Sequence, residues 1–100
     1  MNLFWTPNTY ISYDSIVNYL SEKITQKQVD SFYFTSEEVL DLVLKNSYLF
    51  KTTGDEENIH TAIIHKCTTL YFEIDKNNNR IALLSFFDTR QNPNKRNLLK

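Results

Sequence analysis

The sequence predicts an α+β fold in which a helical hairpin packs against a mainly antiparallel sheet, in the order β-α-α-β-β-β. Apolar residues recur at three- and four-residue spacing in the first half of the chain and at two-residue spacing in the last third. When helices precede strands in this way, they usually gather on one face of the sheet. With 100 residues, we expect a single domain over 1–100, of which 93–100 form a basic tail.

Two consecutive helices are predicted in the first half. Thr6 and Pro7 form a good helix start, because Thr can accept from an early backbone N–H and Pro gives up an N–H that has no partner there. Residues 25–28 have the pattern of a capping box, so a second helix begins at once and the pair forms an antiparallel hairpin. Residues 48–50 are expected to follow the second helix as an apolar clamp. The predicted apolar stripes are Tyr13, Ile16, Val17, Leu20 and Ile24, and then Val29, Phe32, Val39, Leu40, Val43 and Leu44.

A β-hairpin is predicted in the last third. Leu70, Phe72 and Ile74 alternate with more polar residues, which is typical of a strand with one dry face. Residues 81–87 are apolar at nearly every position, which indicates a central strand buried on both faces. Between the two strands, residues 75–80 are polar and tolerate positive φ, as a tight turn requires.

Composition excludes several classes of protein. A hydrophobic content of 41% with one Gly and two Pro excludes a disordered chain. No segment has the length of a membrane span, and the first residues lack the pattern of a signal peptide. Cys67 is the single Cys and cannot form an internal disulfide, so we expect a cytoplasmic protein. Zinc-type clusters and Gly-rich phosphate loops do not occur, and no cofactor or metal is expected.

The charge is distributed unevenly along the chain. The net charge is −1 and the pI about 6.1, which argues against a dedicated nucleic-acid binder with a broad basic surface. From Lys76 onward, however, the chain has six basic residues and a single acidic one, Asp88. This part of the chain is where an anionic partner would dock, or it is a solvated tail without function.

The segment Phe87-Asp88-Thr89-Arg90-Gln91-Asn92-Pro93, placed after a hairpin, resembles the carboxyl-terminal part of ParE-like members of the RelE/ParE toxin superfamily. Phe4-Trp5-Thr6-Pro7 is similar to the short first strand and helix start of that family, and Ile59 to Thr69 to its second strand. The resemblance covers almost the whole chain. It implies a toxin of a type II toxin–antitoxin pair that inhibits DNA gyrase, is neutralised by a cognate antitoxin and takes its oligomeric state from the antitoxin complex.

The RelE-like branch of the same superfamily implies a different activity, the cleavage of mRNA on the ribosome. That reaction needs cationic groups for the phosphorane charge and a proton donor and acceptor near the attacking 2′-OH. Related sequences commonly place an Arg where this chain has His60-Thr61, which favours the non-enzymatic, ParE-like interpretation. A toxin-fold binding protein without toxicity is the third possibility. The candidate residues for the nuclease are Tyr71, Arg80 and Arg90, with Lys95 or Arg96.

Partner-binding residues are expected on the uncovered sheet face and in the basic end. If Leu70, Phe72 and Ile74 face the helices, then Tyr71 and Glu73 face away from them. Arg90 could bind a phosphate or carboxylate with two parallel hydrogen bonds. Alternatively, residues 88–91 only pin the tail across the sheet. The predicted set is Tyr71, Glu73, Arg80, Arg90, Lys95 and Arg96.

His60 and His65 are the side chains best suited to proton transfer near neutral pH. Because they are five apart on one strand, they are expected on opposite faces, where they cannot share a substrate or a metal ion. Each is therefore interpreted as a polar surface residue. Cys67 is interpreted as a small residue of the next turn or of the core, with His65 as its one credible partner.

Overall fold

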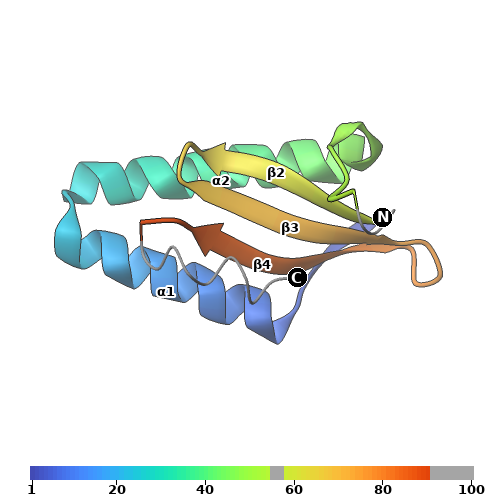
Figure 1. Ribbon diagram of the computed structural model, residues 1–100, viewed down its shortest axis with the longest axis horizontal. Coiled ribbons are helices and arrows are strands. Elements are labelled where there is room, and N and C mark those ends of the chain that lie inside the picture. Colours follow the sequence, from blue (N-terminus) through green and yellow to red (C-terminus); the bar gives the residue numbers. More distant parts are fainter. Residues whose placement is uncertain (55–57, 91–100) are drawn as a thin grey trace.

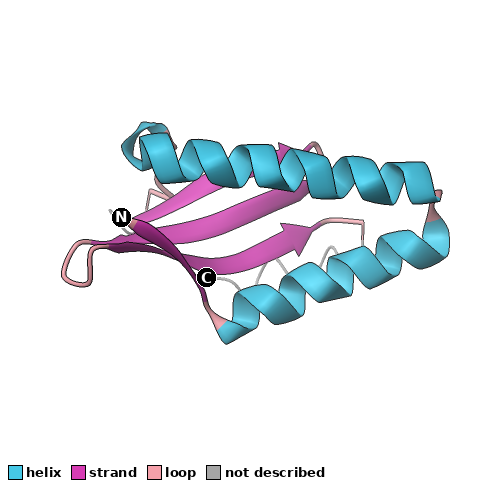
Figure 2. Ribbon diagram, turned by 180° about the vertical axis from the view of Figure 1, so that it is seen from behind, coloured by secondary structure: helices cyan, strands magenta, loops and turns pink. Residues whose placement is uncertain are grey.

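The computed structural model describes residues 1–54 and 58–90, and their elements follow the predicted order (Figure 1). The sheet has the strand order β1-β4-β3-β2, in which β1 runs parallel to β4 and the other neighbours are antiparallel. Both helices lie on one face of this sheet (Figure 2). The predicted helical hairpin on a mainly antiparallel sheet is confirmed. The elements are β1 (Asn2–Trp5), α1 (Pro7–Lys23), α2 (Gln26–Asn46), the 3-10 helix η1 (Ser47–Leu49), β2 (Ile59–His65), β3 (Thr68–Asp75) and β4 (Arg80–Asp88).

Both helices begin at the predicted caps. The Thr6 hydroxyl oxygen accepts from the backbone N–H of Thr9 (3.2 Å), and Pro7 follows as the first helical residue. At α2 the capping box is complete: Thr25 accepts from the Gln28 N–H (3.3 Å), and the Gln28 side chain accepts from the Thr25 N–H (3.4 Å). Because the connection between Lys23 and Gln26 is so short, α1 and α2 can only form an antiparallel helical hairpin. None of the described helices is long and apolar enough to cross a membrane.

The core lies between the two helices and the sheet. It contains most of the predicted stripes together with alternate residues of β3 and β4. Three predicted core positions are wrong. Leu44, Tyr48 and Leu49 are exposed, because Leu44 lies about 100° around α2 from the buried Val43, and Ser47 is the buried residue of η1. The buried apolar core is Ile16, Leu20, Val29, Phe32, Leu40, Val43, Ala62, Ile64, Leu70, Phe72, Ile74, Ile81, Leu83 and Phe86.

Tyr13 fills the space between α1, α2 and β4. Its ring lies 4.8 Å from that of Phe86, 5.5 Å from that of Phe32 and 5.6 Å from that of Trp5, measured between centroids. Its hydroxyl hydrogen-bonds with Ser36. Burial raises the pKa of Tyr13 above its ordinary value, and this effect outweighs the opposing hydrogen bond. One aromatic side chain therefore joins both helices to the central strand.

We expect this buried phenol to make the protein sensitive to alkali. Because the folded-state pKa is raised, the stabilisation is complete below the ordinary Tyr pKa of 10.0 and is lost as the pH rises through the folded-state value. The Tyr13→Phe variant cannot ionise there, so its free energy of unfolding should fall less between about pH 9 and about pH 11. Urea denaturation at both pH values measures this, with Tyr48→Phe at an exposed site as the control. Equal losses in Tyr13→Phe and the unsubstituted protein would contradict the expectation.

The central strand β4 contains a bulge at Leu84, which is an extra residue between two register pairs with β3. The start of α1 binds the backbone on both sides of it. The Thr6 hydroxyl donates to the carbonyl of Leu83 (2.7 Å), and the Ser12 hydroxyl accepts from the N–H of Phe86 (2.9 Å). These side chains satisfy backbone groups that would otherwise be buried without partners at an irregular point of the ladder.

Within residues 1–54 and 58–90, the face of the sheet away from α1 and α2 carries no helix. Tyr71 and Glu73 lie on it and are half-buried, in agreement with the predicted facing. Ala82 and Ser85 of β4 are buried there, because they are small and lie opposite the larger Phe4 and Tyr71. The accessible part of this face is therefore over β2 and β3.

Candidate functional site

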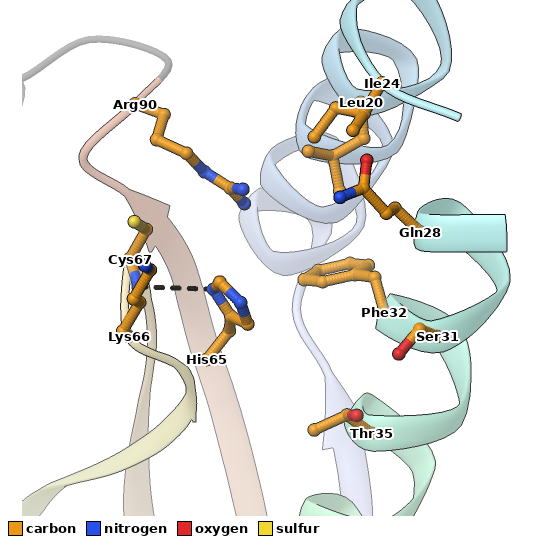
Figure 3. A pocket seen from close by; sticks show the side chains of 10 residues that line it. All are labelled: Leu20, Ile24, Gln28, Ser31, Phe32, Thr35, His65, Lys66, Cys67 and Arg90. Carbon is orange, nitrogen blue, oxygen red and sulfur yellow. Dashed lines mark hydrogen bonds between the residues drawn. The ribbon is translucent and has the colours of Figure 1, made fainter. Parts of the chain in front are cut away.

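A cavity of about 550 Å³ opens where the helical hairpin, the β2–β3 turn and the end of β4 meet (Figure 3). An apolar wall comes from both helices, polar side chains from α2, and nitrogen-bearing side chains from the turn and from the residue just after β4. None of the lining residues that the structure describes is acidic. The lining consists of Leu20, Ile24, Phe32, Gln28, Ser31, Thr35, His65, Lys66, Cys67 and Arg90.

Arg90 lines this site and forms an ion pair with Asp88, whose side chain is buried. Its Nε donates to Asp88 Oδ1 (3.1 Å) and its Nη2 to Oδ2 (2.8 Å), while its backbone N–H also donates to Oδ1 (2.9 Å). Thr68 at the start of β3 donates to Asp88 Oδ2 (2.6 Å). The Asp88 side chain has no exposed surface, whereas 29% of the Arg90 side chain is exposed. The pair fixes the guanidinium at the end of β4, beside the start of β3.

The electrostatics of the pair follow from this geometry. Burial is the largest influence on Asp88 and would raise its pKa, but hydrogen bonds from Arg90 and Thr68 together outweigh it and hold the pKa below the ordinary value. The hydrogen bond with Asp88 is the main cause that raises the pKa of Arg90. Asp88 and Arg90 are therefore both charged at neutral pH.

The end of β4 is also tied to the start of β3 through the backbone. The N–H of Thr89 donates to the carbonyl of Cys67 (2.9 Å). Residues 88–90 thus join the end of β4 to the start of β3, and Arg90 lines the cavity at the same time. The predicted pinning of the tail across the sheet concerns residues outside the described ranges. Gln91, Lys95 and Arg96 lie outside the described residues.

His65 lines the cavity because β2 contains a bulge. Ile63 lies opposite Thr69, but the next pair is His65 with Thr68, so Ile64 is an extra residue. Figure 3 shows the imidazole turned toward Phe32, and its Nδ1 accepts from the N–H of Cys67 (3.4 Å). Lys66 lies beside it in the turn and is exposed.

The prediction for the two His residues was wrong in two respects. His60 is 5% exposed, its ring stacks on Phe72 with centroids 5.3 Å apart, and its Nδ1 donates to the carbonyl of Asn58 (3.1 Å). It is a satisfied core residue rather than a surface one. His65 lies on the helix side as well, because the bulge reverses the alternation that would have placed it on the other face. They still share no site, since His60 pairs with Phe72 and His65 with Thr68 near opposite ends of β2.

The three nuclease candidates do not meet. Arg80 begins β4 and Arg90 follows its end, and β4 itself extends about 26 Å at roughly 3.3 Å per residue. Arg80 Nε donates to Asp75 Oδ2 (3.2 Å), and its guanidinium lies 4.0 Å from the ring centroid of Phe4. Tyr71 lies in the middle of the sheet on the face away from the helices. Of the predicted residues that the structure describes, Arg90 lines the cavity and Tyr71 and Arg80 do not.

The cavity can bind an anion. Lys66 and Arg90 line it with cationic groups, and His65 adds an imidazole. Across the part of the chain that the structure describes, no three His, Cys, Asp or Glu side chains come together as a metal site would require. Lys66 and the polar residues of α2 were not predicted from sequence. The signal that could have found Lys66 is the hairpin register, which brings the residues before Thr68 beside those after Asp88.

Comparison with models of known protein families gave no match, and comparison with curated proteins gave none either.

Proposed function

We propose that this chain is a ParE-like toxin of a type II toxin–antitoxin pair, which inhibits DNA gyrase through protein contacts and is neutralised by a cognate antitoxin. The observation that carries the proposal is the ion pair of Asp88 and Arg90 at the end of β4. Both residues belong to the segment 87–93 that resembles ParE-like toxins. The resemblance thus extends to residues that fix the end of a β-α-α-β-β-β fold, and not only to the order of elements.

The placement of the basic residues favours a function by protein contact over cleavage of RNA. Arg80 and Arg90 are each paired with an Asp, and they lie at opposite ends of β4. A phosphorane needs cationic groups around one phosphate. These two residues cannot act on the same phosphate, which weakens the nuclease formed by Tyr71, Arg80 and Arg90.

Exposed apolar side chains provide surface for macromolecular partners. Ile63 on the edge strand β2 is 72% exposed and Phe34 on α2 is 67% exposed, and several others lie along the helices. Together with Tyr71 and Glu73 on the accessible sheet face, they are candidates for contacts with gyrase or the antitoxin. The partner roles of Tyr71, Glu73, Arg80, Arg90, Lys95 and Arg96 stay predictions.

A second candidate function is supported by a different observation. The cavity brings Arg90 together with His65 and Lys66, so that two cationic groups and an imidazole lie at one site, and such groups are used in RNA cleavage. A RelE-like, ribosome-dependent endoribonuclease would then use the cavity rather than the previously expected residues of the open sheet face.

One induction experiment separates the two functions. The chain is induced in bacteria without an antitoxin, and the rates of DNA synthesis and protein synthesis are measured side by side over the first minutes. We expect DNA synthesis to fall first while translation continues. Early loss of translation would move the assignment to the ribonuclease, and unchanged growth would favour a non-toxic binding protein.

Two substitutions in the cavity sharpen the result. His65→Ala and Lys66→Ala remove exposed side chains and should leave the fold intact. Under gyrase inhibition the double variant still blocks DNA synthesis, whereas under RNA cleavage it loses its effect on translation. Inhibition of supercoiling by purified gyrase, with and without the added chain, provides an independent readout.

A further inference from the structure

We infer that the cavity at the end of the helical hairpin binds a small carboxylate that carries a single negative charge and an apolar body. This inference goes beyond the proposed function and does not depend on it. A volume of about 550 Å³ lies within the range of roughly 300–1,000 Å³ that is common for small-molecule sites. Such sites combine apolar walls with a few placed polar groups, which is the composition found here.

Arg90 supplies a guanidinium that is already held in place. Its Nε and Nη2 bind Asp88, which leaves Nη1 without a hydrogen bond to any residue among 1–54 and 58–90. The edge formed by Nη1 and Nη2 can still donate two parallel hydrogen bonds to a second carboxylate. In Figure 3 the guanidinium extends into the cavity toward Leu20. Because Asp88 is itself fixed by Thr68, little side-chain freedom is lost when a ligand binds.

The charge of the site matches a monoanion. Asp88 balances the charge of Arg90, so that Lys66 is the remaining permanent cation among the described lining residues. Because none of the described lining residues is Asp or Glu, their permanent charges sum to about one cation. A dianion such as a phosphate monoester carries more negative charge than the site can neutralise. It would lose hydration without gaining enough hydrogen bonds from the protein in return.

The body of the ligand is expected to be apolar because of the wall that faces Arg90. Leu20, Ile24 and Phe32 form this wall, and the hydroxyl groups of Ser31 and Thr35 lie along α2 beside it (Figure 3). An aryl or alkyl group can pack on these three side chains while its carboxylate reaches Arg90 and Lys66. An acid of this class removes apolar surface from water without burying an unpaired charge.

The test uses the 100-residue chain and phenylbutyrate as the probe. Isothermal titration calorimetry should show saturable binding with a Kd below about 1 mM, as expected for a ligand of this size. The uncharged amide of the same acid should bind at least about tenfold more weakly, because charge-assisted hydrogen bonds are roughly twice as strong as neutral ones. Phenyl phosphate should also bind more weakly than the acid.

Cys67 gives a second readout, since it lines the cavity and is the single Cys of the chain. Its alkylation by iodoacetamide should slow when phenylbutyrate saturates the site. The amide at the same concentration should protect it less. This rate reports occupancy of the cavity itself rather than binding elsewhere on the surface.

Matched variants locate the site. Lys66→Gln should weaken binding of phenylbutyrate several-fold, whereas Lys76→Gln in the turn at the other end of the sheet should not. Ser31→Phe fills the cavity and should abolish binding, whereas Ser21→Phe on an exposed part of α1 should not. Arg90 is left unchanged because its loss would leave the buried Asp88 carboxylate without its cationic partner.

Several results would overturn the inference. The first is no saturable binding of the acid at millimolar concentration. The second is equal affinity for the acid and the amide, which would mean that the site does not distinguish a charged ligand from an uncharged one. Tighter binding of phenyl phosphate would identify a phosphate site instead, and equal effects of each cavity variant and its control would place the ligand outside the cavity.

Discussion

Replacement of Arg90 with Ala should lower the free energy of unfolding by about 3–5 kcal/mol, the cost of leaving one partner of a buried ion pair uncompensated. The carboxylate of Asp88 has no exposed surface, and two of its hydrogen bonds from side chains come from Arg90. The Thr68 hydroxyl and the Arg90 backbone N–H would remain as donors, which do not supply a balancing charge. Urea denaturation followed by circular dichroism at pH 7 measures the loss.

The double variant Asp88→Ala with Arg90→Ala distinguishes a stranded charge from a lost contact. It should be more stable than Arg90→Ala alone, because it removes the buried carboxylate together with its partner. Arg80→Ala is the matched control. It breaks the pair with Asp75 at the other end of β4, where both partners are accessible to water, and should change stability much less. If the double variant is less stable than Arg90→Ala, the buried charge is not the cause.

The pH dependence of the same variants provides an independent check. In the unsubstituted protein the folded-state pKa of Asp88 is lowered, so its stabilisation is present above the ordinary Asp pKa of 3.8 and is lost as the pH falls through the folded-state value. In Arg90→Ala, burial acts with less opposition and should raise the pKa of Asp88. Protonation then relieves the stranded charge, so the stability difference between the two proteins should narrow from about pH 7 to about pH 4. A difference that widens over this range would contradict the mechanism.

Replacement of Phe72 with Ala should also cost about 3–5 kcal/mol, the usual range for truncating a buried Phe. Phe72 has no exposed surface, and its ring stacks on His60 at 5.3 Å and meets the edge of Phe50 at 5.8 Å. Truncation would leave a void between β3 and the helices, and His60 would lie beside that void. Thermal and urea denaturation should both report the loss.

The control for Phe72 is another Phe in an exposed position. Phe34 on α2 is 67% exposed, so Phe34→Ala should change the free energy of unfolding by no more than about 0.5 kcal/mol. A comparable loss in both variants would indicate that Phe34 is covered in solution, for example by a second molecule. A small loss in Phe72→Ala would mean that the core closes around the missing ring.

The parts of the fold that depend on neighbouring residues could be predicted from the sequence. The caps at Thr6 and Thr25 act within one helical turn, and the periodicity of the strands reflects burial on one face or on both. The bulges at Ile64 and Leu84 could not be predicted, because each depends on a partner strand, and the one at Leu84 is also bound by side chains at the start of α1. The wrong placement of the two His residues follows directly from the bulge in β2.

The candidate site was predicted only in part for the same reason. Arg90 was recognised from the segment that contains it, whereas Lys66 and Ser31 come from a turn and from a helix that reach the cavity only after folding. Their sequence surroundings carry no signal of a shared site. The pairing of Thr68 with Asp88 is the contact that joins these distant segments.

The position of β1 in the sheet affects the order in which a new chain can fold. Its one neighbour among the described strands is β4, with Asn2 opposite Arg80 and Trp5 opposite Leu83. At about 5–20 residues per second, roughly 4–15 s of synthesis separate the two strands. The helical hairpin can form while the ribosome is still at work, but the sheet can close only when the last strand is made. During that interval Phe4 and Trp5 stay available to chaperones.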